Sequence, residues 1–245
     1  MKIIPLNHGI YAVNKQKIFS SFSLENANEE QLKELKIAIC PFLIVLKNEI
    51  ILLDTGLGFI ENGAPVLLHL IEKAGYKANQ ITKVLISHFH KDHIGGIGFF
   101  DERDEFVPNF PNAVVYMQKR ELDFASEQKQ SPSYDFKILN QLKSLPNVVM
   151  LDNDKGEITK EISYEVSKGH TPFHQVFRIK EEDEIAFYGA DDLPQKAYLE
   201  LHVAYKTDYD GKRAMESRKK WEKEAREQHW KVLLYHDMKT PVLEF

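Results

Sequence analysis

Short apolar runs, rich in β-branched residues and bounded by polar or turn residues, recur along the whole chain. Runs of this length and composition are typical of buried strands. The predicted strands are Ile10–Val13, Cys40–Leu46, Glu49–Leu53, Lys83–Ile86, Val114–Met117, Val148–Leu151, Ile162–Val166, Val176–Ile179, Ile185–Tyr188 and Val232–Leu234. Most show little polar alternation, so we expect both faces of their sheets to be covered.

Segments with helical periodicity separate some of these strands. The predicted helices are Pro65–Ala74, Lys119–Glu127, Tyr134–Ser144 and Lys212–Gln228. In the last of them Ala214, Trp221 and Ala225 fall on one side, while acids and bases alternate elsewhere, as on a solvated helix face. Continuous apolar strands between helices predict an α/β fold in which helices cover the sheets.

A cluster of metal-ligand residues follows the predicted strand that ends at Ile86. It contains His88, His90, Asp92 and His93. Residues two apart in extended backbone point to the same side, so both His88 and His90 can reach one ion. Asp92 and His93 come where the chain turns toward Gly95–Gly96, and they can face a second ion. Imidazole and carboxylate ligands suit Zn, Mn or Fe.

Further ligand types stand directly after later predicted strands. His170 follows Ile162–Val166, Asp191 follows Ile185–Tyr188, and His236 follows Val232–Leu234. Catalytic zinc keeps one position open for water, whereas structural zinc is closed by four protein ligands. The sequence therefore predicts a metal site built at the ends of several strands.

At this point the chain resembles the metallo-β-lactamase-fold hydrolase superfamily. Five motifs carry the resemblance in order: Leu52–Gly56, His88–His93, Gly169–Pro172, Asp191 and His236. The resemblance implies a four-layer αββα sandwich, with residues 1–245 forming one domain. His202–Asp210, the charged helix and Leu234–Asp237 resemble the lactonase-like branch.

The resemblance also implies a role for each ligand residue. His88, His90 and His170 would bind one metal ion. Asp92, His93 and His236 would bind a second, and Asp191 would bridge the two. Asp92 and Asp191 are also the residues assigned to catalysis. The implied cofactors are two divalent ions, with Zn²⁺ favoured over Mn²⁺ or Fe²⁺.

Two aspartates leave alternatives open. Asp54 would orient a metal ligand by the resemblance, but beside Gly56 it also suits a simple turn. Asp192 competes with Asp191 for the bridging position. Family patterns place a proline three residues after the bridging aspartate, and Pro194 favours Asp191 by that count. Asp192 is then expected to be a solvated loop carboxylate.

The chain departs from the lactonase-like pattern at two positions. Phe173 stands where many members have glycine after the Gly169–Pro172 motif. Pro194 stands where some lactone-cleaving members have tyrosine, and Tyr198 lies four residues further on. These departures argue against acyl-homoserine-lactone cleavage, although not against hydrolysis.

The remaining histidines have no metal-ligand spacing. We expect His69 and His174 to be structural and His229 to be solvated. His202 lies near the expected site, so a role in the substrate pocket stays open. The one cysteine, Cys40, excludes an intramolecular disulfide and a thiolate metal cluster, and we expect it to be buried.

The expected activity is hydrolysis of an ester, a lactone or a related small molecule by a metal-bridging hydroxide, because a bound divalent ion lowers the pKa of water. The sequence has no Gly-x-Ser-x-Gly nucleophile motif. Two other classes remain: a mononuclear-iron oxygenase acting on a thiol or persulfide, and a non-catalytic metal-binding protein. The oxygenase would leave Asp92, His93 and His236 without a task.

Charge and hydropathy narrow the partners. A net charge of −5 with no basic stripe argues against nucleic acid. No apolar run reaches membrane-spanning length, and the first residues lack a secretory signal, so a cytoplasmic protein with a small-molecule substrate is expected. Two polar segments, 20–36 and 101–111, are candidates for lids, for contacts in a homodimer, or for plain surface loops. Within the first, Glu29–Lys36 is expected to form a short helix.

Overall fold

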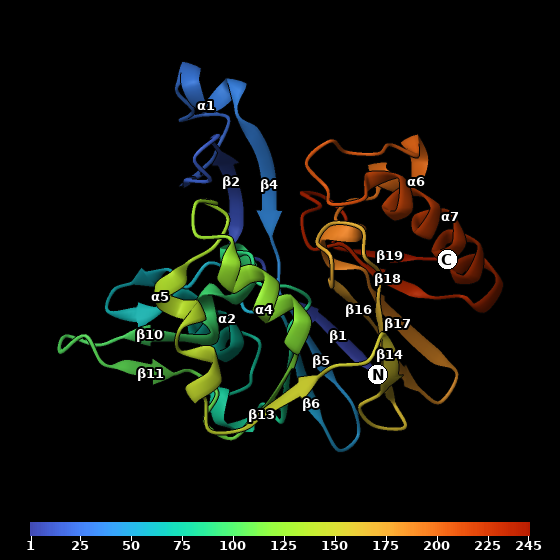
Figure 1. The fold of residues 1–245 in the computed structure, drawn as a ribbon, viewed down its shortest axis with the longest axis horizontal. Helices are drawn as coiled ribbons and strands as arrows, with labels where there is room; N and C mark the ends of the chain where they lie inside the picture. Colours follow the sequence, from blue (N-terminus) through green and yellow to red (C-terminus); the bar gives the residue numbers. More distant parts are fainter.

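The computed structural model describes all residues, 1–245, and its centre is a pair of six-stranded sheets (Figure 1). The first sheet has the order β1-β5-β6-β9-β12-β13. Its strands are β1 (Lys2–Pro5), β5 (Phe42–Val45), β6 (Ile50–Leu53), β9 (Lys83–Leu85), β12 (Val114–Gln118) and β13 (Val148–Leu151). Strands β6, β9, β12 and β13 run parallel, so their carboxyl ends meet at one edge.

The second sheet has the order β14-β15-β16-β17-β18-β19. Its strands are β14 (Lys155–Glu157), β15 (Ile162–Val166), β16 (Gln175–Glu181), β17 (Glu184–Tyr188), β18 (Lys231–Leu233) and β19 (Val242–Glu244). Only β17 and β18 pair in parallel; the other neighbours are antiparallel. The parallel pair brings the ends of β17 and β18 to the same edge.

Helices cover the outer face of each sheet. The first sheet is covered by α2 (Val66–Lys73), α4 (Lys119–Glu127) and α5 (Phe136–Leu139), and the second by α6 (Ala197–Leu201) and α7 (Gly211–Gln228). A core of 20 buried residues from both sheets fills the space between them, and separate cores lie under the two helical layers. The predicted αββα sandwich is confirmed.

A smaller sheet, drawn in blue, projects from the top of this sandwich (Figure 1). It has the order β3-β2-β4, formed by Phe19–Ser21, Gly9–Val13 and Leu35–Ile39, and it carries the short helix α1 (Glu29–Lys33). The helix predicted at Glu29–Lys36 was therefore too long, because the alternating residues from Leu35 onward join the sheet. Segment 20–36 is thus a structured part of this arm and not a plain loop.

Other departures from the predicted elements are local. The helix expected at Tyr134–Ser144 is replaced by α5 and a single 3₁₀ turn at Leu142–Ser144. Segment 101–111 contains one strand of a hairpin, β10 (Gly98–Phe100) with β11 (Phe106–Pro108), and β7 (Ile60–Glu61) pairs with β8 (Ala64–Pro65). The remaining short helix is α3 (Lys91–Ile94), and further 3₁₀ turns lie at Ala78–Gln80, Gly95–Ile97 and Ala190–Asp192.

No helix of the structure combines the length and the apolar composition needed to cross a membrane.

Candidate metal centre

Three imidazoles converge where strands from both sheets end. The Nδ1 atom of His90 lies 3.0 Å from Nε2 of His88 and 3.1 Å from Nε2 of His170. His88 and His90 come from the segment after β9, and His170 from the loop after β15. The alternation of extended backbone, together with the pairing of the two sheets, places all three nitrogens around one point. With Asp191 they form the first group of facing ligand atoms.

A second group lies beside the first and consists of Asp92, His93 and His236. Nε2 of His236 and Nε2 of His93 lie 3.6 Å and 3.9 Å from one carboxylate oxygen of Asp92. Asp92 and His93 belong to α3, and their ligand atoms face His236, as the sequence pattern suggested. His236 arrives from the segment that follows β18.

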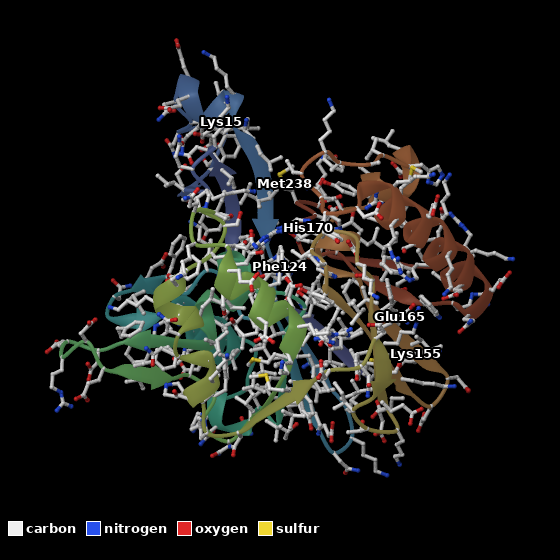
Figure 2. The ribbon with its side chains drawn as sticks, viewed as in Figure 1. Lys15, Phe124, Lys155, Glu165, His170 and Met238 are labelled. Atoms are coloured by element: carbon white, nitrogen blue, oxygen red, sulfur yellow. The ribbon has the colours of Figure 1, made fainter.

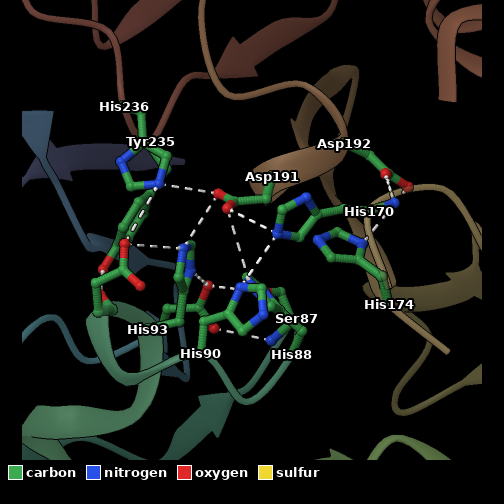
Figure 3. A network of polar contacts seen from close by, with 12 residues as sticks. Ser87, His88, His90, His93, His170, His174, Asp191, Asp192, Tyr235 and His236 are labelled. Carbon is green, nitrogen blue, oxygen red and sulfur yellow. Dashed lines mark hydrogen bonds and ion pairs between the residues drawn. The ribbon is translucent and has the colours of Figure 1, made fainter. Parts of the chain in front are cut away.

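Asp191 lies between the two groups (Figure 3). Its Oδ1 is 3.0 Å from Nε2 of His236 and 3.1 Å from Nε2 of His93. Its Oδ2 is 3.2 Å from Nε2 of His170 and 3.9 Å from Nε2 of His88. One carboxylate therefore turns a different oxygen toward each group, and all seven predicted ligand residues lie in one place.

The other ring nitrogen of most of these histidines is fixed by a neighbour. Nδ1 of His93 lies 2.7 Å from Oδ2 of Asp54, and Nδ1 of His236 lies 2.7 Å from the Ala38 carbonyl. A carbonyl can only accept, so His236 donates from Nδ1, and its Nε2 is the atom that faces Asp191. Partners of this kind orient metal-binding imidazoles and fix their tautomer.

Asp54 is the hub of this support. Its carboxylate is fully buried and accepts hydrogen bonds from the Ser87 backbone N–H at 2.8 Å, the Ser87 hydroxyl at 2.6 Å and the Tyr188 hydroxyl at 2.6 Å. With φ near 53° it also occupies the left-handed region, which aspartate tolerates better than most residues. Asp54 thus combines the two functions considered from sequence, a turn residue and a partner of a ligand.

His170 has a partner that sequence reasoning missed. Its Nδ1 lies 2.8 Å from Oδ1 of Asp208, in the segment between α6 and α7. The same segment binds the His170 loop through its backbone, because the N–H groups of Tyr209 and Asp210 donate to the carbonyls of His170 and Gly169. Asp208 stands in a polar stretch with several other candidates, so no local pattern singles it out.

The prediction that Asp192 is solvated was wrong. Its side chain is fully buried, accepts a hydrogen bond from the backbone N–H of His170 and lies 3.6 Å from Nδ1 of His174. The Ser167 hydroxyl, 3.1 Å from Nδ1 of His174, completes this cluster. Asp192 therefore braces the His170 loop from behind, while Asp191 faces the ligand groups.

The carboxylates and imidazoles of the centre lie close enough to shift one another's pKa values. Burial raises the pKa of the Asp191 carboxyl, but the charges of His236, His93 and His170 outweigh it and hold that pKa well below its usual range. Burial lowers the pKa of His93, yet Asp191 and Asp54 more than compensate and raise it well above the ordinary value. For His88, burial and then the charges of His93 and His90 outweigh the opposing effect of Asp191 and keep its pKa well below 6.5.

The donor set fits two divalent ions. Nε2 of His93 and Oδ1 of Asp191 are buried and make no hydrogen bond, although such atoms are normally satisfied. Nitrogen ligands about 2.0–2.1 Å from a tetrahedral ion lie about 3.3 Å apart, close to the spacing of the first group. Imidazole with carboxylate is a donor set for Zn, Mn or Fe and not for Ca or Mg.

A cavity of about 180 Å³ opens onto this centre. One wall is apolar and comes from the arm sheet; the other is polar and comes from the segment around α6. The lining includes Val13, Phe19, Leu35, Ile37, Pro194, Gln195, Tyr198, Tyr205, Thr207 and Asp208. His202 is not among the lining residues and is exposed, so the structure does not bring it to the site.

The fold and this centre together are those of an αββα protein that carries a cluster of His and Asp metal ligands at one edge of its sheets. The sequence model described as "Metallo-beta-lactamase superfamily" matches residues 41–234, most of the chain. The chain therefore belongs to the metallo-β-lactamase superfamily, as its motifs suggested. No curated protein sequence gives a significant match.

Solved structures agree on the fold. A probable metal-dependent hydrolase from Staphylococcus aureus is similar with a TM-score of 0.79 at 19% identity, covering 99% of this chain and 91% of that one. AidC, a dizinc quorum-quenching lactonase solved with a product, has a TM-score of 0.73 at 24% identity, covering 98% and 88%. The hydrolase AbOPH has a TM-score of 0.73 at 21% identity, covering 99% and 89%.

Proposed function

We propose that this protein is a dinuclear metal-dependent hydrolase, with zinc the favoured metal, that acts on an ester, lactone or related small molecule. The observation that carries the proposal is Asp191, whose two oxygens face the two ligand groups at 3.0 Å and 3.2 Å. A single ion would need only one of those groups. Hydrolase and lactonase neighbours with the same fold agree with this reading.

Each of the two ligand groups would bind one metal ion. His88, His90 and His170 would hold one ion and Asp92, His93 and His236 the other, with Asp191 between them. Two divalent ions in such a site supply a water of lowered pKa and polarise a carbonyl oxygen. Asp54, Asp208 and the Ala38 carbonyl each contact the Nδ1 atom of one ligand histidine, namely His93, His170 and His236. The Nε2 atom of each of these rings is therefore the one directed toward the metal site.

Tyr198 is a candidate to contact the substrate. It lines the cavity and stacks on Tyr205, with ring centroids 4.8 Å apart. Burial is the main cause that raises the pKa of the Tyr198 phenol, so the hydroxyl stays protonated. A protonated phenol lining the cavity could donate to a developing negative charge.

The first experiment is metal analysis by mass spectrometry on protein purified without chelator, alongside Asp92→Ala, His236→Ala and a control, His69→Ala. His69 is exposed on α2, far in sequence from every ligand. We expect about two ions per chain in the parent and control and about one in each ligand variant. An ester and lactone panel follows on the same samples.

Other results would point to the other classes. One iron per chain, unchanged in Asp92→Ala and His236→Ala, would mean that the second group is unused and would direct screening to oxygen chemistry. Bound metal with no turnover of esters, lactones, amides or phosphodiesters would indicate a binding protein. Full activity after metal removal, or in Asp191→Ala, would refute the proposal outright.

A further inference from the structure

Two lysines at the mouth of the cavity have no anionic partner. Lys17, in the turn between β2 and β3, and Lys91, the first residue of α3, both line the cavity over the metal centre. Neither ammonium lies within 4.0 Å of a carboxylate, whereas Asp208 is paired with His170 and Lys137 with Asp104. The Lys91 ammonium lies 6.0 Å from the centre of the Phe19 ring.

Lys17, Phe19 and Lys91 also line a second hollow on the other side, with Phe59, Phe100 and Lys137. The three side chains therefore form the rim between the two hollows. The carboxylates near this rim are already engaged. Asp208 contacts His170, while Asp135, in the second hollow, caps α5 by accepting from the N–H groups of Lys137 and Ile138.

The cavity itself is about 180 Å³, smaller than the roughly 300–1,000 Å³ of ordinary ligand pockets, so part of a substrate must extend to the rim.

Lys17 also occupies an unfavourable backbone conformation. Its φ is 55°, in the left-handed region where glycine is preferred. A glycine could therefore replace Lys17 without backbone strain.

We propose that Lys17 and Lys91 form a cationic clamp for a carboxylate or phosphate group on the substrate, set apart from the carbonyl that reacts. The preferred substrates are then small esters or lactones that carry an anion, and the apolar wall of Val13, Leu35 and Ile37 packs against the carbon chain between the two ends. The inference rests on the proposed hydrolase function, because it identifies the reacting end by the metal centre.

The test is binding, measured by calorimetry on protein as purified, with butyrate, glutarate and 4-phosphonobutyrate as probes. Glutarate is butyrate with a second carboxylate at the end of the chain, and 4-phosphonobutyrate carries a phosphonate in place of that second carboxylate. We expect the parent to bind at least one dianion about tenfold more tightly than butyrate, since charge-assisted hydrogen bonds are roughly twice as strong as neutral ones. The dianion that binds more tightly distinguishes a carboxylate clamp from a phosphate clamp.

Matched variants assign the preference to the two lysines. Lys17→Gln combined with Lys91→Gln should remove it, whereas Lys15→Gln should keep it, since Lys15 lies on the same turn but does not line the cavity (Figure 2). Equal binding of butyrate and both dianions by the parent would overturn the proposal. So would a preference that survives the double substitution, or one lost equally in Lys15→Gln.

The Lys17→Gly variant tests the clamp independently of the stability of the fold. Glycine suits the backbone at this position, so the thermal midpoint should not fall, while the preference for dianions should weaken. Glu182→Gly, in the turn between β16 and β17 with φ 54°, is the control that should leave the preference intact. A preference for dianions without ester turnover would contradict the hydrolase alone; ester turnover without that preference would contradict the clamp alone.

Discussion

The two ligand groups are supported by different parts of the molecule. In the second group His93 rests on Asp54, which strand-end residues of both sheets hold through Ser87 and Tyr188. The ring of Tyr235 stacks on His93 at 4.2 Å. In the first group His170 relies on Asp208, in a segment outside both sheets. One group is therefore fixed by the sandwich itself and the other partly by a surface segment.

This contrast shows that the residues that bind the metal and the neighbours that hold those residues in place are set by different parts of the molecule. The seven ligand positions lie on the segments that follow strands β9, β15, β17 and β18, but their affinity for metal depends on neighbours with very different surroundings. A support buried between sheets cannot relax when it is weakened. A support on an outer segment can move or be replaced by water, so its loss should be milder.

The largest effect is expected from Asp191, which serves both groups. Asp191→Ala should lower metal content from about two ions per chain to below one and reduce kcat/KM by at least about 1,000-fold, because both ions lose a ligand. Metal analysis and kinetics on the same preparation check this. The matched control is Asp183→Ala, in the exposed turn between β16 and β17. Two retained ions in Asp191→Ala would mean that no bridging carboxylate is needed.

A smaller effect is expected when one group alone loses a histidine. His170→Ala and His236→Ala should each leave about one ion per chain, bound by the intact group. If either variant loses both ions, the groups are not independent sites. Titration of the stripped protein with Zn²⁺ distinguishes one high-affinity site from two.

The next prediction sharpens the comparison between supports. Asp54→Asn should weaken binding of one ion by about 10–100-fold, because the amide cannot accept all the hydrogen bonds that the carboxylate accepts. Asp208→Asn should weaken the other by less than about tenfold, since its segment can adjust. Competition with a chelator measures both constants. An equal loss in the two variants would show that the two supports contribute equally to metal affinity.

The smallest effect on the metals is expected from Glu121, a fully buried residue of α4 that accepts a hydrogen bond from the Phe173 N–H behind the His170 loop. Burial raises its pKa from 4.5 to about 7. A raised pKa means that the neutral form stabilises the fold below pH 4.5 and that this contribution is lost as pH rises through about 7. Its size is roughly 3 kcal/mol.

Glu121→Gln should therefore flatten the pH dependence of the free energy of unfolding between pH 4.5 and about 7 and leave metal content unchanged. Denaturant unfolding of parent and variant at matched metal content, over that interval, provides the measurement. Parallel pH profiles for the two proteins would show that the carboxyl is already ionised in the folded state.

The sequence predicted most of the sandwich because its signals are strong there. Val148–Leu151, Ile162–Val166 and Lys119–Glu127 have the predicted bounds, since apolar runs and helical periods coincide with burial. The arm was harder: Leu35–Ile39 reads as the continuation of a polar helix until its pairing with β2 is known. Tertiary pairing, not local propensity, decides such segments.

The residues of the candidate site also include some that the sequence identified and some that it did not. Residues that stand at strand ends were found from their chemistry and position, and the structure brings them together. Asp208 and the buried role of Asp192 were not found, because their partners are distant in sequence and come together only in the folded chain. Lys17 was not singled out either, since its backbone conformation is invisible in a list of residues.

A shared carboxylate has a thermodynamic consequence. If Asp191 touches both ions, filling one position fixes its rotamer and alters its charge for the other, so the two affinities are linked. Linkage is reciprocal: whatever factor the first ion imposes on the second, the second imposes on the first. If the first ion strengthens binding of the second, protein with one ion is scarce; if it weakens binding, protein with one ion predominates. In either case the amount of protein with two ions does not follow a simple hyperbola as the metal concentration rises.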